Sequence, residues 1–311
     1  PSKLSVDTVR KLVPELRRLV RGFSRRTGRN LFVFLDDAHL VDSALQPQMF
    51  ELLHSILKGT GGSLKIAGVK NFICLYQPSQ RVGVQQPGDV QLIYLDLTLV
   101  DPASAREHLV SVLKQFLKEC GFSRTNQIMH DRAIDRLVWC SAGVPRDFLQ
   151  LFERSLGFAI QHRRKRVGIE EVNMAVGEFG EEKSHELEHD TSEDGESLRL
   201  ALDKLKRVVL DDHKWNSFLV RQDTKHPGYK FLQKLVDLRL VHLIHPSITP
   251  GKAGDRYEAY LLDYSFYTGI RRRRGLREIK IEVDKPPTYT TLRGLPKVQL
   301  DDFAPEASRE S

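Results

Sequence analysis

An adjacent pair of acids, Asp36 and Asp37, directly follows an apolar run from Leu31 to Leu35. Because the run shows no polar alternation, it predicts a strand buried on both faces, as in the parallel sheets of α/β proteins. Ligands of such sheets bind beyond the carboxyl ends of the strands. There the first carboxylate can hold Mg²⁺ while the second prepares a water molecule for attack on a phosphate. The alternative is a pair of solvated acids that end a strand.

Arg146 lies in an unusual position for a cation. It follows Pro145, which suits the first turn of a predicted helix. The positive end of the helix dipole disfavours a cation there by about 0.3–1 kcal/mol. An anion should therefore compensate Arg146, and that anion is either a bound phosphate or the neighbouring Asp147.

The acid pair and the segments 66–71 and 141–147 together resemble the AAA+ ATPases, and among them the initiator branch that includes the origin-recognition ATPases. The resemblance covers about residues 1–280. It implies that Asp36 binds Mg²⁺ and that Asp37 stands where a catalytic glutamate usually lies. Since aspartate is one methylene shorter, an attacking water would have to lie closer to the chain. The implied cofactors are ATP and Mg²⁺.

The same resemblance implies roles for three further side chains around the nucleotide. Asn71 is the sensor 1 candidate, whose amide would orient water against the terminal phosphate, and the alternative is a turn residue at a strand end. Arg146 is the sensor 2 candidate and would reach the γ-phosphate. Arg81 corresponds to an arginine that relatives offer to the nucleotide of a neighbouring subunit, which implies a homo-oligomer. The alternative for Arg81 is a solvated loop arginine.

One motif of such ATPases is missing, because no G-x-x-x-x-G-K-[ST] phosphate loop occurs in the sequence. The stretch from Gly59 to Ser63 has no lysine, and Gly251-Lys252-Ala253 has no hydroxyl residue. The chain also begins with Pro1 and opens directly into a helix. We therefore expect a fragment whose phosphate loop lies upstream or is absent.

The pattern of apolar residues predicts an α/β fold in which a truncated parallel-sheet ATPase core is followed by a helical lid. The core covers residues 1–100 and the lid residues 101–178. Asp101 with Pro102 forms the start of the first lid helix, and Gly121 closes it. The expected helices are 6–26, 45–58, 102–121, 129–141, 145–163 and 169–177, and the expected strands are 31–35, 64–69 and 90–95.

The C-terminal part of the sequence has the organisation of a winged-helix (α+β) domain. We expect an acidic linker at 179–197, the domain at 198–284 and a mobile tail at 285–311. The expected elements of the domain are helices at 197–210, 213–221 and 228–239, and hairpin strands at 240–244 and 257–262.

The last of these helices and the hairpin after it carry cations suited to double-stranded DNA. The helix would enter the major groove, while cations of the wing and of the basic run beyond it would meet phosphates. The alternative partner is a protein. The candidate DNA-binding residues are Lys230, Gln233, Lys234, Lys252, Arg256, Arg271, Arg272, Arg273 and Arg274.

Composition agrees with an intracellular protein that has an anionic partner. The 311 residues carry a net charge of +7, and the isoelectric point is near 9.3. No apolar stretch reaches the length of about 20 residues that a membrane helix needs, and we expect a cytoplasmic protein. Cys74, Cys120 and Cys140 form no motif for a disulfide framework or for zinc.

Two functions are compatible with these features. The first is an AAA+ switch that binds and hydrolyses ATP in its full-length form and couples nucleotide state to DNA binding through the winged helix. The alternative is a non-hydrolysing scaffold in which nucleotide holds an oligomer together and the winged helix binds protein.

Overall fold

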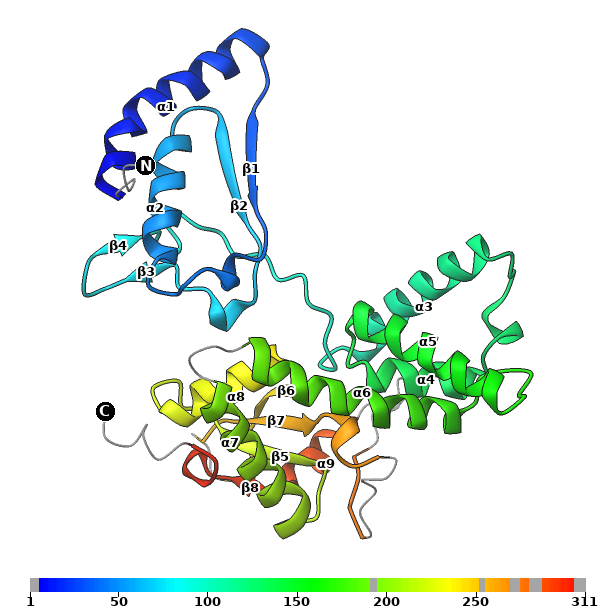
Figure 1. The fold of residues 1–311 in the computed structure, drawn as a ribbon. Coiled ribbons are helices and arrows are strands. Elements are labelled where there is room, and N and C mark those ends of the chain that lie inside the picture. The colour runs from blue at the N-terminus through cyan, green and yellow to red at the C-terminus, as the bar shows by residue number, and fades with distance from the viewer. Residues whose placement is uncertain (1–5, 191–194, 252–254, 269–274, 280–286, 305–311) are drawn as a thin grey trace. The chain divides into compact units, whose positions relative to one another are not determined.

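The computed structural model describes residues 6–190, 195–251, 255–268, 275–279 and 287–304. The chain forms two compact units, which are Pro1–Tyr94 (unit 1) and Leu95–Ser311 (unit 2). Both units combine helices with small sheets, so the expected α/β class is confirmed at this coarse level (Figure 1). Among the helices of the described residues, none is both long and apolar enough to cross a membrane.

Unit 1 is built around a parallel pair of strands. Strand β1 pairs with β2 from Leu31 opposite Gly62 to Leu35 opposite Ile66, as expected for a βαβ unit. Helix α2, which connects these strands, packs against α1 on one side of the sheet (Figure 1). The elements of unit 1 are α1 (Val6–Thr27), β1 (Leu31–Leu35), α2 (Gln46–Leu57), β2 (Gly62–Ile66), β3 (Tyr76–Gln77) and β4 (Val82–Gly83).

The prediction that β1 is buried on both faces is wrong for the described chain. Its side chains alternate between partly buried and exposed, and Phe32 and Phe34 are 51% and 75% exposed. Leu35 on the other face packs with Ile66 against the small core around Phe50. The helices of unit 1 therefore cover one face of this sheet, and the aromatic face is open.

The predicted third strand, Val90–Leu95, is absent from the structure. The segment is irregular, and its side chains Ile93 and Tyr94 are 72% and 62% exposed. A strand requires a neighbour for its backbone hydrogen bonds, and within the described residues the parallel sheet consists of β1 and β2 alone. A short antiparallel hairpin of β3 and β4, which the sequence pattern did not predict, precedes this segment.

Unit 2 begins with the helices that the sequence predicted. Asp101 caps the first of them by accepting a hydrogen bond from the Ser104 amide at 3.1 Å, and Gly121 ends it with a left-handed φ of 85°. These helices are α3 (Pro102–Glu119), α4 (Asp131–Cys140), α5 (Pro145–Gln161) and α6 (Ile169–Asp190).

The predicted acidic linker at 179–197 is wrong over most of its length. Helix α6 runs through to Asp190, and α7 starts at Gly195. Phe179 is buried, and Gly180 packs so closely on Ser265 that an added Cβ would lie 2.3 Å from the serine Cβ. Lys183, which is also buried, joins acidic side chains. Tertiary contacts therefore order a stretch whose composition alone indicated a linker.

The C-terminal half of unit 2 folds around a four-stranded sheet with the order β6-β7-β5-β8. Strand β5 occupies the place of the predicted helix 213–221, so that prediction is wrong. Phe218, Leu219 and Val220 are completely buried at the centre of the sheet, and a short apolar run does not by itself distinguish a strand from a helix. The remaining elements are α7 (Gly195–Lys206), a π-helical turn (Arg207–Asp212), β5 (Ser217–Arg221), α8 (Pro227–Asp237), β6 (Val241–Ile248), β7 (Tyr257–Leu262), α9 (Tyr289–Arg293) and β8 (Lys297–Val298).

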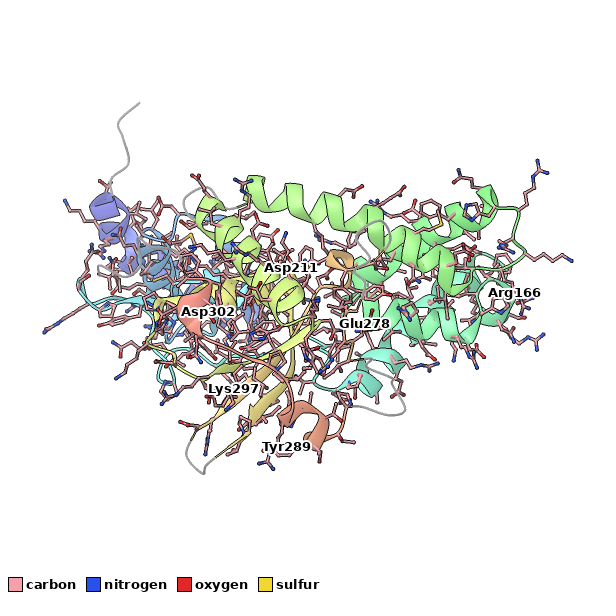
Figure 2. All side chains as sticks on the ribbon, turned by 90° about the horizontal axis from the view of Figure 1, so that it is seen from below. Arg166, Asp211, Glu278, Tyr289, Lys297 and Asp302 are labelled. Atoms are coloured by element: carbon pink, nitrogen blue, oxygen red, sulfur yellow. The ribbon has the colours of Figure 1, made fainter. Side chains whose placement is uncertain are left out.

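The predicted mobile tail is wrong for residues 287–304, while 285–286 and 305–311 lie outside the described residues. Strand β8 pairs in parallel with β5, and Leu292 and Phe303 are buried. The hydroxyl of Tyr289 in α9, which is labelled in Figure 2, accepts a hydrogen bond from the Thr249 amide at 2.9 Å. This segment is therefore part of the core of unit 2.

Candidate functional site

The candidate Mg²⁺ ligand lies at the carboxyl edge of the parallel sheet. Beyond Leu35, the ladder continues with hydrogen bonds from Ala67 N to Leu35 O (2.9 Å) and from Ala38 N to Ala67 O (3.0 Å). Between these bonds Asp37 adopts a left-handed φ of 48°, and its amide donates to Asp36 Oδ1 at 3.0 Å. Both acids are exposed. The turn therefore presents two accessible carboxylates at the edge where ligands of parallel sheets bind.

A buried glutamine, which the sequence reasoning missed, holds the two loops at this edge together. Gln46 is 0% exposed, and its Nε2 donates to Val41 O at 2.7 Å and to Phe72 O at 3.2 Å. Its Oε1 accepts from Cys74 N at 2.7 Å. One side chain thus joins the loop after β1 to the loop after β2. No periodicity marks this role, since a polar residue in the first turn of a helix is usually solvated.

The sensor 1 candidate lies in the second of these loops. Asn71 is exposed within a short 3₁₀ turn, Lys70–Phe72, and β2 has already ended at Ile66. The predicted strand 64–69 is therefore shifted towards the N-terminus. Because Gln46 holds Phe72 beside Val41, the loop of Asn71 is fixed next to the loop of the two acids.

The finger candidate, Arg81, lies at the tip of the β3–β4 hairpin. It has a left-handed φ of 54°, its amide donates to Pro78 O at 3.3 Å, and its side chain is exposed. A hairpin tip holds an arginine in solvent, which fits contact with another molecule and fits simple solvation equally well.

The sensor 2 candidate belongs to unit 2, where Arg146 is exposed in the first turn of α5. The alternative that Asp147 compensates its charge is wrong. Asp147 is only 2% exposed, and its carboxylate binds Lys183 Nζ at 3.0 Å and Arg239 Nη1 at 2.6 Å instead. None of the described residues pairs with the guanidinium of Arg146, which remains available to an external anion at a helix N-terminus.

Asp147 is part of an ionic cluster formed by Asp147, Lys183, Arg239, His242 and Asp263, in which Asp147, Lys183 and Asp263 are buried. Lys183 Nζ bridges Asp147 Oδ2 and Asp263 Oδ2 at 3.0 and 3.1 Å, and His242 Nε2 lies 2.9 Å from the same oxygen of Asp263. The cluster joins several elements, because Asp147 lies in the first turn of α5, Lys183 lies within α6 and Arg239 follows α8. It therefore ties the helical bundle to the C-terminal sheet.

The charges of this cluster stabilise one another against burial. Burial favours the neutral form of Asp263, but the charges of Lys183 and His242 and a hydrogen bond from Ser265 outweigh it, so its pKa is well below the usual value. Burial likewise opposes the charged form of Lys183, and the attraction of Asp263 and Asp147 raises its pKa above the usual value. Both groups are charged at neutral pH.

The candidate DNA-binding side chains of α8 differ in their surroundings. Lys230 is exposed, whereas Lys234 is half-buried. Gln233 Nε2 donates to Tyr260 Oη at 2.9 Å, and Tyr260 in turn donates to the buried carboxylate of Glu258 at 2.6 Å. The amide of Gln233 is therefore engaged with the sheet of its own domain.

Beyond α8, Arg256 is exposed immediately before β7. Lys252 and the run Arg271–Arg274 lie outside the described residues. Among the described candidates, Lys230 and Arg256 are thus exposed cations, and Lys234 is partly exposed.

The chain matches no family model, no curated protein and no solved structure. Within the described residues, no group of three or more His, Cys, Asp or Glu side chains could hold a metal ion. Asp36 nevertheless fits Mg²⁺, because this ion usually keeps several waters and binds one or two protein carboxylates together with substrate phosphates.

Proposed function

We propose that this chain is part of an ATP-dependent switch of the AAA+ initiator type that acts on double-stranded DNA. Asp36 holds Mg²⁺·ATP at the carboxyl edge of β1 and β2, with Asp37 and Asn71 beside the terminal phosphate. Arg146 binds a phosphate of the nucleotide. Helix α8 and the hairpin β6–β7 form the DNA-binding part of a winged helix. Support comes from the accessible acids at a parallel sheet edge and from Arg146 at a helix start, whose guanidinium has no acidic partner among the described residues.

One observation carries the coupling step of this proposal, namely the ion pair between Asp147 and Arg239. Asp147 directly follows Arg146, and Arg239 lies two residues after the end of α8, which bears Lys230. A movement of the start of α5 on phosphate binding would displace a buried carboxylate that is held by Lys183 and Arg239. Packed side chains with discrete arrangements carry such coupling between sites.

The proposal requires a phosphate-binding loop that these 311 residues do not contain. We therefore expect isothermal titration of the chain with Mg²⁺·ATP to give a dissociation constant no tighter than about 1 mM, or about −4.1 kcal/mol. A protein with a complete site should bind about a thousandfold more tightly. Micromolar binding by this chain would contradict the proposal that tight nucleotide binding requires a phosphate-binding loop in addition to these residues.

The second candidate function is the non-hydrolysing scaffold, which the geometry of Asp37 favours. Its short side chain extends from a left-handed turn, so a water placed for attack must lie close to the backbone. A steady-state ATPase assay on a form that includes a phosphate loop separates the two functions. The switch predicts turnover that falls about tenfold in Arg146→Ala, equal to about 1.4 kcal/mol, and the scaffold predicts no turnover.

A further inference from the structure

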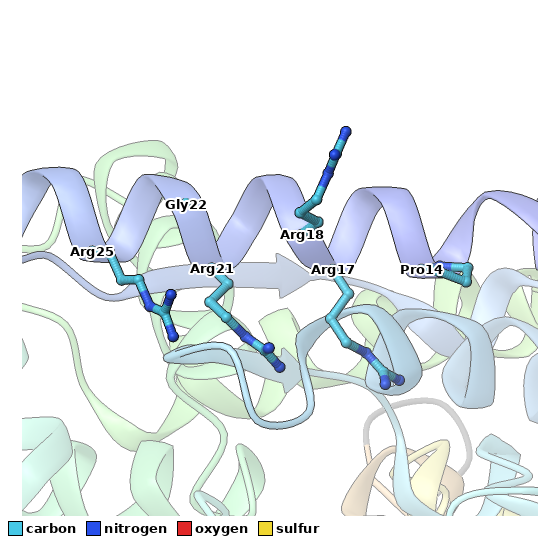
Figure 3. Close-up of a pocket in the computed structure, with 6 residues that line it drawn as sticks. All are labelled: Pro14, Arg17, Arg18, Arg21, Gly22 and Arg25. Atoms are coloured by element: carbon cyan, nitrogen blue, oxygen red, sulfur yellow. The ribbon is translucent and has the colours of Figure 1, made fainter.

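Helix α1 carries a row of arginines that the proposed function does not use. Arg17, Arg21 and Arg25 follow one another at intervals of four residues, which corresponds to steps of about 6 Å along the axis. Figure 3 shows all three side chains on the same side of the helix, while Arg18 points away from them. The three arginines line an open depression together with Pro14, Arg18 and Gly22. We call Arg17, Arg21 and Arg25 the arginine row.

Carbonyl groups at the end of α2 hold part of this row in place. Arg17 donates from Nε and Nη2 to Ser55 O at 3.0 and 2.5 Å, and Arg21 Nη2 lies 3.4 Å from Gly59 O. A guanidinium has five N–H donors, so these contacts leave further donors free. Because these contacts already restrict the side chains of Arg17 and Arg21, a ligand that orders them has a smaller entropic cost to offset.

The row has no acidic partner in the part of the chain that the structure describes. Within the described residues, no carboxylate forms an ion pair with Arg17, Arg21 or Arg25, whereas Arg10 near the start of the same helix binds Glu51 at 3.2 Å. Like charges at intervals of four residues in a helix destabilise it by a few tenths of a kcal/mol per pair. An anionic ligand with several charges at a similar spacing would reduce the repulsion between these arginines.

We propose that the arginine row binds the phosphate backbone of a nucleic acid. The planar guanidinium fork matches phosphate oxygens, and the steps along the row are comparable with those between successive phosphates of a strand. Backbone contacts of this kind carry no sequence information, so the row adds affinity and orientation rather than specificity. This surface belongs to unit 1 and is separate from the DNA contacts proposed for α8 and its hairpin.

The distribution of apolar side chains on α1 favours a nucleic acid over an anionic membrane. Leu12, Leu19 and Phe23 are 44%, 54% and 42% exposed. At about 100° per residue they lie on the side of the helix opposite the arginine row. A helix that lies in a membrane surface has cations beside its apolar face, so that both contact the bilayer together. The two faces of α1 cannot do so at once.

Paired variants of the full chain test this proposal. Arg21→Gln/Arg25→Gln removes two charges from the row and keeps Arg17, which supports α2. Arg26→Gln/Arg29→Gln is the matched control, because it removes the same charge nearby, and Arg26 bonds to Gly22 O of its own helix. Binding of labelled duplex DNA is measured by fluorescence anisotropy between about 50 and 200 mM salt.

The row variant is expected to weaken binding about tenfold at low salt and to flatten the slope of log K against log salt by about two. The control is expected to change the slope by less than about one. Equal effects of both pairs would overturn the proposal, as would an unchanged slope in the row variant. Loss of binding to phosphatidylserine vesicles with unchanged DNA binding would also overturn it and assign the row to a membrane.

A third pair separates this proposal from the function proposed above. Lys230→Gln/Arg256→Gln removes two exposed cations of the C-terminal domain. Weaker binding in both this pair and the row variant supports both surfaces. If the C-terminal pair alone weakens binding, the arginine row is excluded and the proposed function stands. If the row variant alone weakens binding, the row is supported, and the DNA contacts of Lys230 and Arg256 are excluded.

Discussion

Replacement of Lys183 with methionine is expected to lower the free energy of unfolding of unit 2 by about 3–5 kcal/mol. The ammonium group is buried between Asp147 and Asp263, and each carboxylate is 2% exposed. Without it, Asp263 keeps only its contacts with Ser265 and His242 among the described residues, while Asp147 keeps Arg239. A buried charge that loses its partner retains its desolvation cost, which is why removing one side of such a pair is so unfavourable.

Urea denaturation followed by tryptophan fluorescence measures this effect in unit 2 alone, because both tryptophans of the chain, Trp139 and Trp215, lie there. Lys206→Met is the matched control. Lys206 binds Asp203 at 2.7 Å, but the carboxylate side chain is 54% exposed, and such a pair contributes about 0–1 kcal/mol. If Lys183→Met costs no more than this control, the cluster does not hold unit 2 together.

The cluster also predicts how stability depends on pH. Since the folded-state pKa of Asp263 is lowered, its contribution is fully present above the unfolded value of about 3.9 and is lost as the pH falls through the folded value. The raised pKa of Lys183 acts in the opposite direction, so its contribution is present below about 10.4 and is lost at higher pH. The free energy of unfolding of Asp263→Asn should therefore decrease less steeply at acid pH than that of the unmodified chain.

DNA binding by the C-terminal cations is the second large effect that we expect. If six or more of the candidate side chains meet phosphates, affinity for duplex DNA should fall about 10³-fold or more between 50 and 200 mM salt. Alanine at Arg271–Arg274 removes four of these charges and should reduce the salt slope by about three to four. The effect should be the same for every duplex sequence, because backbone contacts carry no sequence information.

A matched control for that variant exists in the helical bundle. The run Arg163–Arg166 also contains four cations and lies between α5 and α6, where Figure 2 shows Arg166 at the surface. Alanine at these four positions should leave most of the slope intact. Absence of DNA binding at low salt, or equal losses in both variants, would move the C-terminal domain to the protein-binding class. Lys230→Ala alone should change sequence preference, whereas Gln233 is engaged with Tyr260.

Local signals in the sequence were sufficient for the helices of unit 2 but not for several other elements. Asp101 and Gly121 mark helix ends by hydrogen bonds within a few residues, which is why α3 was predictable. The segment 213–221 became a strand because β7 and β8 lie beside it, and no local pattern records those neighbours. Composition likewise failed for 179–190, since one buried lysine and a close glycine contact order that stretch.

The candidate site shows the same division. The place of Asp36 and Asp37 beyond a strand followed from an apolar run and its acidic end. The role of Gln46 did not, because its three partners lie in two loops that approach only after folding. Asp147 was recognised as a charge near Arg146, but its true partners, Lys183 and Arg239, are distant in sequence.

Paramagnetic broadening of amide signals by Mn²⁺·ATP is the most direct test of whether Asp36 binds the metal of a nucleotide at the edge of β1 and β2. With isotope-labelled chain and nucleotide at about millimolar concentration, we expect the amide signals of Asp36, Asp37 and residues 68–71 to broaden first. Asp36→Asn should abolish this broadening. Asp42→Asn, an exposed acid nearby whose Oδ1 accepts from Ala44 N, should leave it unchanged. Broadening that persists in Asp36→Asn, or that is centred on other residues, would show that Asp36 does not hold the metal.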